Sequence, residues 1–355
     1  MILTPAPFSV SLPPMRLIIK CFILLCLFNA LTLPIRAETG MRVYLATDWK
    51  AQAEHGGFYQ AKARGLYKKA GLNVRIIQGG PTVNVPQLLA TKTVDFAMGS
   101  SFAALNLVAA GVPAKAIMAG FQKDLQVLIT HPRQDIRSIA DMKGKPIMIA
   151  DNTITKFWVW LKAKFGFTDS QIRKYTFNLA PFLVNPQAIQ QGYLSSEPYL
   201  IEKESGIKPQ VFLLADEGYP SYATIIMTQQ DWIDQHPDKV QAFVDASIQG
   251  WMEYIYGDPS PGNALILKAN PDMTQDVIDQ AIRVLREHEV LVSGDAARLG
   301  IGAMTEARWE RFFKTMSKYG VYDANLDWRA AFTKIGAPLL QQHLLIKTIK
   351  QLIKA

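Results

Sequence analysis

The stretch 42-RVYLATDWKAQAEHGGFYQAKARGLYKKAGLNVRIIQGG-80 decides the fold that we predict for this chain. Residues 42–46 have the composition of a β-strand, and residues 57–70 have that of a helix that Gly71 ends. A second strand is predicted over residues 73–78. A strand, a helix and a strand in this order are typical of a parallel βαβ unit, so the sequence indicates an α/β fold.

The same alternation continues in two series, which predict two α/β lobes. The second series begins near Pro132, and the apolar run 222–227 can return the chain to the first lobe. We therefore predict that the second lobe, residues 131–222, is inserted into a first lobe made of residues 41–130 and 223–335. The loops at the carboxyl ends of the strands should face one cleft, where open α/β sheets bind ligands. The C-terminal part is mostly helical, with helices predicted over 237–256, 274–288, 305–319 and 327–335 and a helix or tail over 336–355.

Residues 1–37 have the features of a signal peptide. Basic residues precede an apolar run over 21–33, and Ala37 comes before a polar start. The run is short for a mature membrane span, so we expect cleavage after Ala37 and a periplasmic protein. A retained membrane anchor is the alternative. A lipoprotein fits less well, because Leu25 occupies the position where a small residue should precede Cys26.

Cysteine content and charge exclude several classes of function. Both cysteines, Cys21 and Cys26, lie in the leader, so the mature chain has no disulfide, thiolate metal site or cysteine nucleophile. The leader also holds three basic and no acidic residues, and its removal lowers the net charge from +8 to +5. The remaining excess is spread along the chain rather than gathered in a patch, which argues against nucleic-acid binding.

The turn after the first predicted strand supplies three candidate ligand contacts. Trp49 offers a flat face for stacking, and Asp48 can accept a hydrogen bond from a ligand N–H group. Tyr59, on the following helix, is close enough in sequence to reach the same turn. The alternative is a core tryptophan with Asp48 as a turn or capping residue, and for Tyr59 the alternative is packing.

Glu54 and His55 form an acid–imidazole pair just before two glycines. Adjacent residues rarely chelate one metal, no cysteine or second histidine stands at a ligating spacing, and no nucleophile-elbow sequence is present. We therefore expect neither a metal site nor a catalytic residue here. Gly56 and Gly57 would instead let a ligand approach the free N–H groups of a helix start.

Four further polar turns open predicted helices and supply the remaining candidates. Asn84 and Ser100 follow strands of the first lobe, without the sequence of a phosphate loop or a dinucleotide fingerprint. Asn152 opens a helix of the second lobe. Glu197 could bind an amidine-like heterocycle edge by paired hydrogen bonds, or act as a first-turn carboxylate stabilised by the helix dipole. Ordinary helix capping is the alternative for the other three.

These motifs together resemble those of a known class. The chain over about residues 41–227 resembles the periplasmic solute-binding proteins of the nitrate/sulfonate/taurine class, most closely the branch that binds the pyrimidine precursor of thiamine. The residues that carry the resemblance are Asp48-Trp49, 54-EHGGFYQA-61, 65-GLYKKAGL-72 and Gly79-Gly80-Pro81.

The resemblance implies a two-lobed, type II periplasmic-binding-protein fold that closes on a small molecule, without a cofactor, as a monomer. It also implies an ABC permease of the inner membrane as partner. In the pyrimidine branch an aromatic residue after the first strand stacks on the ring, and an acid of the second lobe bonds its edge; Trp49 and Glu197 match these positions. The resemblance carries Asp48, Tyr59, Asn84 and Ser100 over as further candidates.

Two other functions stay open. A receptor for a small sulfonate or nitrate would use helix N-termini and need no aromatic platform. Pyrimidine synthases of the eukaryotic type share the fold and consume a histidine and pyridoxal phosphate. Their family has a cysteine-rich signature that the mature chain lacks, and a leader argues against access to cytosolic pyridoxal phosphate. We therefore expect a binding protein rather than an enzyme, with other heterocycles such as flavins as possible solutes.

Overall fold

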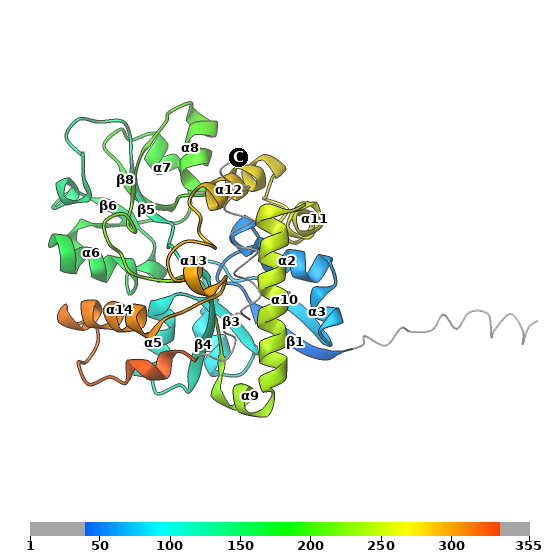
Figure 1. Cartoon of the computed structure of the whole chain (residues 1–355). Helices are drawn as coiled ribbons and strands as arrows, with labels where there is room; N and C mark the ends of the chain where they lie inside the picture. The colour runs from blue at the N-terminus through cyan, green and yellow to red at the C-terminus, as the bar shows by residue number, and fades with distance from the viewer. Residues whose placement is uncertain (1–39, 334–355) are drawn as a thin grey trace, which may run out of the picture. The chain divides into compact units, whose positions relative to one another are not determined.

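The structure, a computed structural model, describes residues 40–333 and is drawn in Figure 1. The predicted leader over residues 1–37 and the predicted tail over residues 336–355 lie outside the described residues. Within residues 40–333, no helix is both long enough and apolar enough to cross a membrane. These residues form two five-stranded sheets with helices packed around them, which confirms the α/β prediction.

The first sheet has the strand order β2-β1-β3-β10-β4. Strand β1 pairs in parallel with β2 and β3, as the predicted βαβ unit requires. Strand β10 returns the chain to this sheet, as predicted for residues 222–227, and it runs antiparallel to both β3 and β4. The βαβ rule governs strands joined within one sheet, whereas β10 enters from the other sheet. The bounds are β1 Met41–Ala46, β2 Leu72–Ile77, β3 Phe96–Gly99, β4 Ala114–Phe121 and β10 Ala223–Gln229.

The second sheet has the order β7-β6-β8-β5-β9. Strand β6 is parallel to β7 and β8, and β5 is antiparallel to β8 and β9. The predicted limit at residue 130 assigns β5 to the first lobe, but its pairing places it in the second sheet. The chain thus crosses between the sheets at residues 122–125 and again at 214–222. The bounds are β5 Gln126–Thr130, β6 Ile147–Ile149, β7 Ile172–Lys174, β8 Ile189–Tyr193 and β9 Gln210–Leu213.

One arginine from the C-terminal part holds the two crossovers together. Arg308 lies on α14 (Glu306–Lys318), and its Nη2 donates to the carbonyl of Gln122 at 2.5 Å and to that of Ser221 at 3.2 Å. Its guanidinium also lies 3.9 Å from the ring centre of Tyr222. Arg308 of α14 therefore links the two crossovers to each other.

Glycine has a different role at the start of α2 (Gly56–Ala63) from the one predicted. A side-chain carbon at Gly57 would lie 2.2 Å from the Trp251 ring, and one at Gly56 would lie 1.9 Å from the Tyr254 ring. Both aromatic residues belong to α10 (Pro237–Tyr256), which packs across α2 (Figure 1). The two glycines thus allow close packing of two helices rather than the approach of a ligand.

The helices predicted over 237–256, 274–288 and 305–319 are present as α10, α12 and α14, within one residue of the predicted bounds. The helix predicted over 57–70 is interrupted at Gly65, whose φ of +70° ends α2 before α3 begins. Within the described residues, the helix predicted over 327–335 is a 3-10 turn over Trp328–Ala331. Helices α7, α9, α11 and α13 were not predicted. The bounds are α3 Leu66–Lys69, α4 Val85–Ala90, α5 Ser101–Ala109, α6 Phe157–Phe165, α7 Ala180–Leu183, α8 Glu197–Ser205, α9 Gln230–Gln235, α11 Ser260–Ala269, α12 Gln275–Glu287 and α13 Ala296–Leu299.

Candidate ligand-binding site

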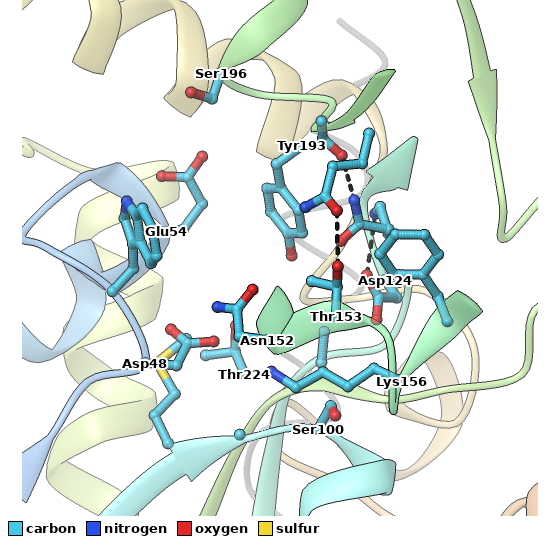
Figure 2. Close-up of a pocket in the computed structure, with 18 of the residues that line it drawn as sticks. Asp48, Glu54, Ser100, Asp124, Asn152, Thr153, Lys156, Tyr193, Ser196 and Thr224 are labelled. Carbon is cyan, nitrogen blue, oxygen red and sulfur yellow. Dashed lines mark hydrogen bonds between the residues drawn. The ribbon is translucent and has the colours of Figure 1, made fainter. Parts of the chain in front are cut away.

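A cavity of about 200 Å³ lies between the two sheets, and residues from both sides line it (Figure 2). This volume is far above that of a single water, so the cavity has room for a small organic molecule. The lining includes five predicted residues, which are Asp48, Trp49, Ser100, Asn152 and Glu197. It also includes residues that were not predicted as ligand contacts, among them Glu54, His55, Asp124, Lys156, Phe177 and Tyr193.

Asp48 and His55 form a pair on the first-sheet side of the cavity. His55 is 1% exposed, and its Nε2 lies 3.1 Å from Oδ1 of Asp48, whose side chain is 44% exposed. Desolvation favours the protonated form of Asp48, but the hydrogen bond from His55 and the charges of His55 and Lys156 outweigh it, so its pKa is below the usual value. Asp48 is therefore an ionised acceptor, and His55 must donate to it through Nε2.

Trp49 contacts an aromatic residue of the opposite side. Its ring centre lies 4.4 Å from that of Phe177, with the ring planes at 51°. Phe177 has a φ of +61°, which is unusual for a bulky residue, and its ring also lies 5.0 Å from that of Tyr175. Aromatic rings from both sides thus form one wall of the cavity, against which a planar ligand could pack.

Glu54 joins the two sides through a hydrogen bond. Its carboxyl group is 4% exposed and accepts from the hydroxyl of Ser195, which follows β8. Burial raises the pKa of Glu54, and the charge of Asp48 raises it further, although the bond from Ser195 opposes this shift. Glu54 and His55 therefore lie in a 3-10 turn that faces the cavity, and each has its own partner rather than the other.

Glu197 occupies the first turn of α8 on the second-sheet side. Its Oε2 accepts from the backbone N–H of Tyr193 at 2.8 Å, and its Oε1 accepts from the Tyr175 hydroxyl at 3.4 Å. Burial is the main reason why its pKa is raised. Gly192 allows this arrangement, because a side-chain carbon there would lie 3.1 Å from Cβ of Glu197.

Asp124 lies in the first crossover and is 8% exposed. Its Oδ1 accepts from the backbone N–H of Gln126 at 3.0 Å. Burial raises the pKa of Asp124 to about 7, and the charges of Lys156 and Arg308 only partly offset this. Tyr193 is nearby: its hydroxyl projects into the cavity (Figure 2), and the carboxyl groups of Asp124, Glu54 and Asp48 add to the burial that raises its pKa.

Hydrogen bonds order the turn that presents Asn152. Gln191 accepts through Oε1 from the backbone N–H of Ala150 and from the Thr153 hydroxyl, each at 2.7 Å. These bonds connect the turn after β6 to strand β8. Asn152, which lies in this turn, is therefore held at the edge of the cavity.

Tyr59 and Asn84 lie away from the cavity. Tyr59 is 4% exposed and packs in the hydrophobic core, where burial raises its pKa to about 12. Asn84 is the N-cap of α4, and its Oδ1 accepts from the backbone N–H of Gln87 at 3.2 Å. For Asn84 the capping alternative explains the residue. Tyr59 lies on the face of α2 that packs against the core.

The missed residues differ in how they could have been found. Asp124 stands between two apolar strands, and nothing in the local pattern distinguishes it from a loop acid. Lys156 could have been noticed, because a lysine at the start of α6 is opposed by the helix dipole. Phe177 follows a short strand, and only its contact with Trp49 reveals its place in the site.

Comparison with known families identifies the chain. A family model described as NMT1/THI5-like matches residues 52–261. The chain belongs to this family. The match spans most of the residues from which the resemblance to solute-binding proteins was drawn, and it confirms that resemblance.

Relatives of this family member include binding proteins and an enzyme. The riboflavin-binding protein RibY of Chloroflexus aurantiacus is 24% identical over 314 residues, which cover 86% of this chain and 88% of RibY. A formylaminopyrimidine-binding protein of Halalkalibacterium halodurans is 22% identical, covering 82% and 90% of the two chains. A 4-amino-5-hydroxymethyl-2-methylpyrimidine phosphate synthase of Schizosaccharomyces pombe is 23% identical, covering 63% and 72%.

Solved structures confirm the periplasmic-binding-protein fold. The periplasmic aliphatic sulphonate binding protein SsuA of Escherichia coli has a TM-score of 0.62 at 13% identity, covering 82% of this chain and 92% of its own. A Candida albicans protein described as having the generic periplasmic binding protein fold has a TM-score of 0.58 at 15% identity, covering 84% and 98%. At these identities the likeness concerns the fold and not the ligand.

Proposed function

We propose that this NMT1/THI5-like protein is the extracytoplasmic solute-binding component of an ABC importer and captures a small aromatic heterocycle, with a pyrimidine precursor of thiamine as the leading candidate. The observation that carries the proposal is a cavity that combines an aromatic wall with four carboxyl groups, those of Asp48, Glu54, Asp124 and Glu197. A carboxyl group can accept a hydrogen bond from the exocyclic amino group of an aminopyrimidine, and in its protonated form it can donate one to the neighbouring ring nitrogen.

The charge of the cavity argues against an anionic ligand. Its lining holds four carboxyl groups, and Lys156 is the one lysine or arginine side chain among the lining residues. The pKa values of Glu54, Asp124 and Glu197 are raised mainly by burial, so a further negative charge placed among them would be desolvated and poorly compensated. A sulfonate or nitrate receptor would need the opposite balance of charge.

The two sides of the cavity suggest how the ligand is captured. A ligand between Trp49 and Glu197 would contact both sheets at once, so it would favour a closed arrangement by its differential affinity. The crossovers at 122–125 and 214–222 are the proposed hinges, and the inserted second lobe is the proposed moving part. Export through the predicted leader and docking on a permease belong to the same proposal.

Two named relatives support a heterocycle, since both the riboflavin-binding and the formylaminopyrimidine-binding protein carry the name of a planar nitrogen ring system. Because one relative is named as a synthase, we also test whether this chain is an enzyme. Incubation of the purified chain with pyridoxal phosphate and assay for a pyrimidine product would distinguish a binding protein from a pyrimidine synthase. We expect no product, and product formation would contradict the binding-protein proposal.

Mass spectrometry of the ligand that stays bound through native purification tests the proposal directly. Calorimetric titration should then compare an aminopyrimidine, riboflavin, an alkanesulfonate and nitrate. We expect the aminopyrimidine to bind best and both anions to bind poorly. A co-purified sulfonate, or tight binding of an anion with no heterocycle bound, would contradict the proposal.

A further inference from the structure

The two ends of the cavity differ in hydrogen-bonding chemistry. Figure 2 shows Glu54 and Ser196 at one end and Lys156 and Ser100 at the other. Glu54 contributes acceptor oxygens to the first end, and Glu197 lies beside Ser196 in the chain. The second end contains an ammonium group and a hydroxyl, and the ammonium supplies three N–H donors that the first end lacks.

Lys156 is held in the cavity without a protein partner. Among residues 40–333 its Nζ forms no hydrogen bond and no ion pair. Its positive charge nevertheless lowers the pKa values of Asp48 and Asp124. The side chain is half-buried, and Figure 2 shows the ammonium directed into the cavity. Its three N–H donors are therefore free to bind acceptor atoms of a ligand in the cavity.

A second donor at this end is also unpaired. The hydroxyl oxygen of Ser100 is buried and has no hydrogen-bond partner among the described residues. The side-chain amide of Asn152 lines the same cavity and likewise makes no hydrogen bond within residues 40–333. Ser100, which follows β3 of the first sheet, and Asn152 and Lys156, which follow β6 of the second sheet, therefore offer unpaired donors and acceptors to the cavity.

Folding alone does not explain why a lysine stands at residue 156. It is the N-cap of α6, where the helix dipole favours an acid or a neutral capping side chain over a cation. Its side chain caps no N–H group of that helix. A lysine that is unfavourable for its helix and directed into a ligand cavity is more consistent with a binding role.

We propose that Lys156, with Ser100 and Asn152, binds a neutral oxygen acceptor on the ligand, such as a carbonyl or hydroxyl substituent. The ligand would then carry N–H donors toward the carboxyl end and this oxygen on the far side of its ring. A neutral oxygen fits better than an anion, because the ionised Asp48 and the buried Asp124 face the same ammonium. This inference rests on the proposed function and specifies the class of solute more narrowly.

Matched ligands and matched variants test this assignment. The ligands are three 4-aminopyrimidines that differ at ring position 5, which bears a methyl, a hydroxymethyl or a carboxylate group. The variants are Lys156→Met, which removes the ammonium but keeps most of the stem, and Lys162→Met as control. Lys162 lies on the same helix but pairs with Asp169.

Calorimetry should give the following pattern. The wild-type protein binds the hydroxymethyl compound at least tenfold more tightly than the methyl and carboxylate compounds. Lys156→Met abolishes the preference for hydroxymethyl over methyl, with little change for the methyl compound, and Lys162→Met preserves it. Such a cycle isolates the contact between Lys156 and the substituent from a general effect on the site.

The failures are distinguishable. If the wild-type protein binds no aminopyrimidine, the proposed function fails and this inference fails with it. If it binds all three compounds and Lys156→Met weakens them by one common factor, the inference alone is overturned. A preference for the carboxylate would also overturn it, because Lys156 would then be an anion site.

Discussion

The turn after β1 and the crossover that leaves β4 each direct an aspartate into the cavity, but their surroundings differ. Asp48, in the turn, has a hydrogen bond from His55 and the charge of Lys156 beside it, and its pKa is below the usual value. Asp124, in the crossover, accepts from one backbone N–H group, and burial raises its pKa to about 7. One cavity therefore holds an ionised aspartate and one that titrates near neutral pH.

This difference shows that placement in the cavity does not by itself set the protonation state. A cationic partner makes the charged form of a carboxyl group favourable, whereas burial without one makes it costly. Glu54 and Glu197 resemble Asp124 in this respect, because burial is the leading cause of their raised pKa values. The cavity is therefore less negative near neutral pH than its four carboxyl groups suggest.

The largest effect is expected for Asp124→Asn, tested by urea unfolding of the ligand-free protein at pH 5 and pH 8. The folded-state pKa lies above the unfolded one, so the native state holds the proton and loses stability as pH rises from about 4 to 7. The variant should be more stable than wild type by about 2–4 kcal/mol at pH 8. The difference should shrink toward pH 4. An equal difference at both pH values would show that Asp124 is not shifted.

Trp49→Ala removes the aromatic residue next to Asp48. Binding of the native ligand should weaken by about 1–3 kcal/mol, with base–aromatic stacking as the guide. Calorimetric titration measures this, and Trp49→Phe should recover part of the loss because it keeps a ring. If Trp49→Ala bound the ligand as tightly as wild type, Trp49 would not be a ligand contact, and its role would be limited to packing against Phe177.

Glu197→Gln tests whether the second-sheet side accepts hydrogen bonds from the ligand. The amide keeps one acceptor oxygen, so affinity for an aminopyrimidine should fall by roughly tenfold, the effect of about one hydrogen bond. Fluorescence or calorimetric titration at pH 7 provides the measurement. An alkanesulfonate should bind the variant as well as or better than wild type. If the variant bound the heterocycle more tightly, Glu197 would have no acceptor role.

Asp48→Asn should give the smallest effect, of opposite sign to that of Asp124→Asn. The folded-state pKa of Asp48 is lowered, so its ionised form contributes stability that is present above about pH 4 and is lost as pH falls below it. Because the side chain is 44% exposed, we expect a loss of only about 0.5–1 kcal/mol at pH 8. Urea unfolding measures this loss. A gain in stability would show that the ionised form of Asp48 is not stabilised by its surroundings and that the two aspartates do not differ as described.

Some parts of the site could be predicted because they follow local rules. Asp48 and Trp49 come directly after a strand of a parallel pair, and such turns lie at the carboxyl edge of the sheet whatever the rest of the chain does. The same rule placed Ser100 after β3. It does not state where a side chain points, which is why Asn84 is a helix cap and Tyr59 lies in the core.

The sequence alone determined the α/β alternation, the family and the turns from which ligand contacts could come, since each depends on short-range pattern and composition. Only the tertiary structure decided which groups meet. Glu54 bonds Ser195, and Trp49 contacts Phe177, across more than a hundred residues of intervening chain. Burial of Asp124 and the unpaired state of Lys156 likewise depend on packing between sheets. Desolvation and long-range contacts set the charges of this cavity, and neither has a signature in the local sequence.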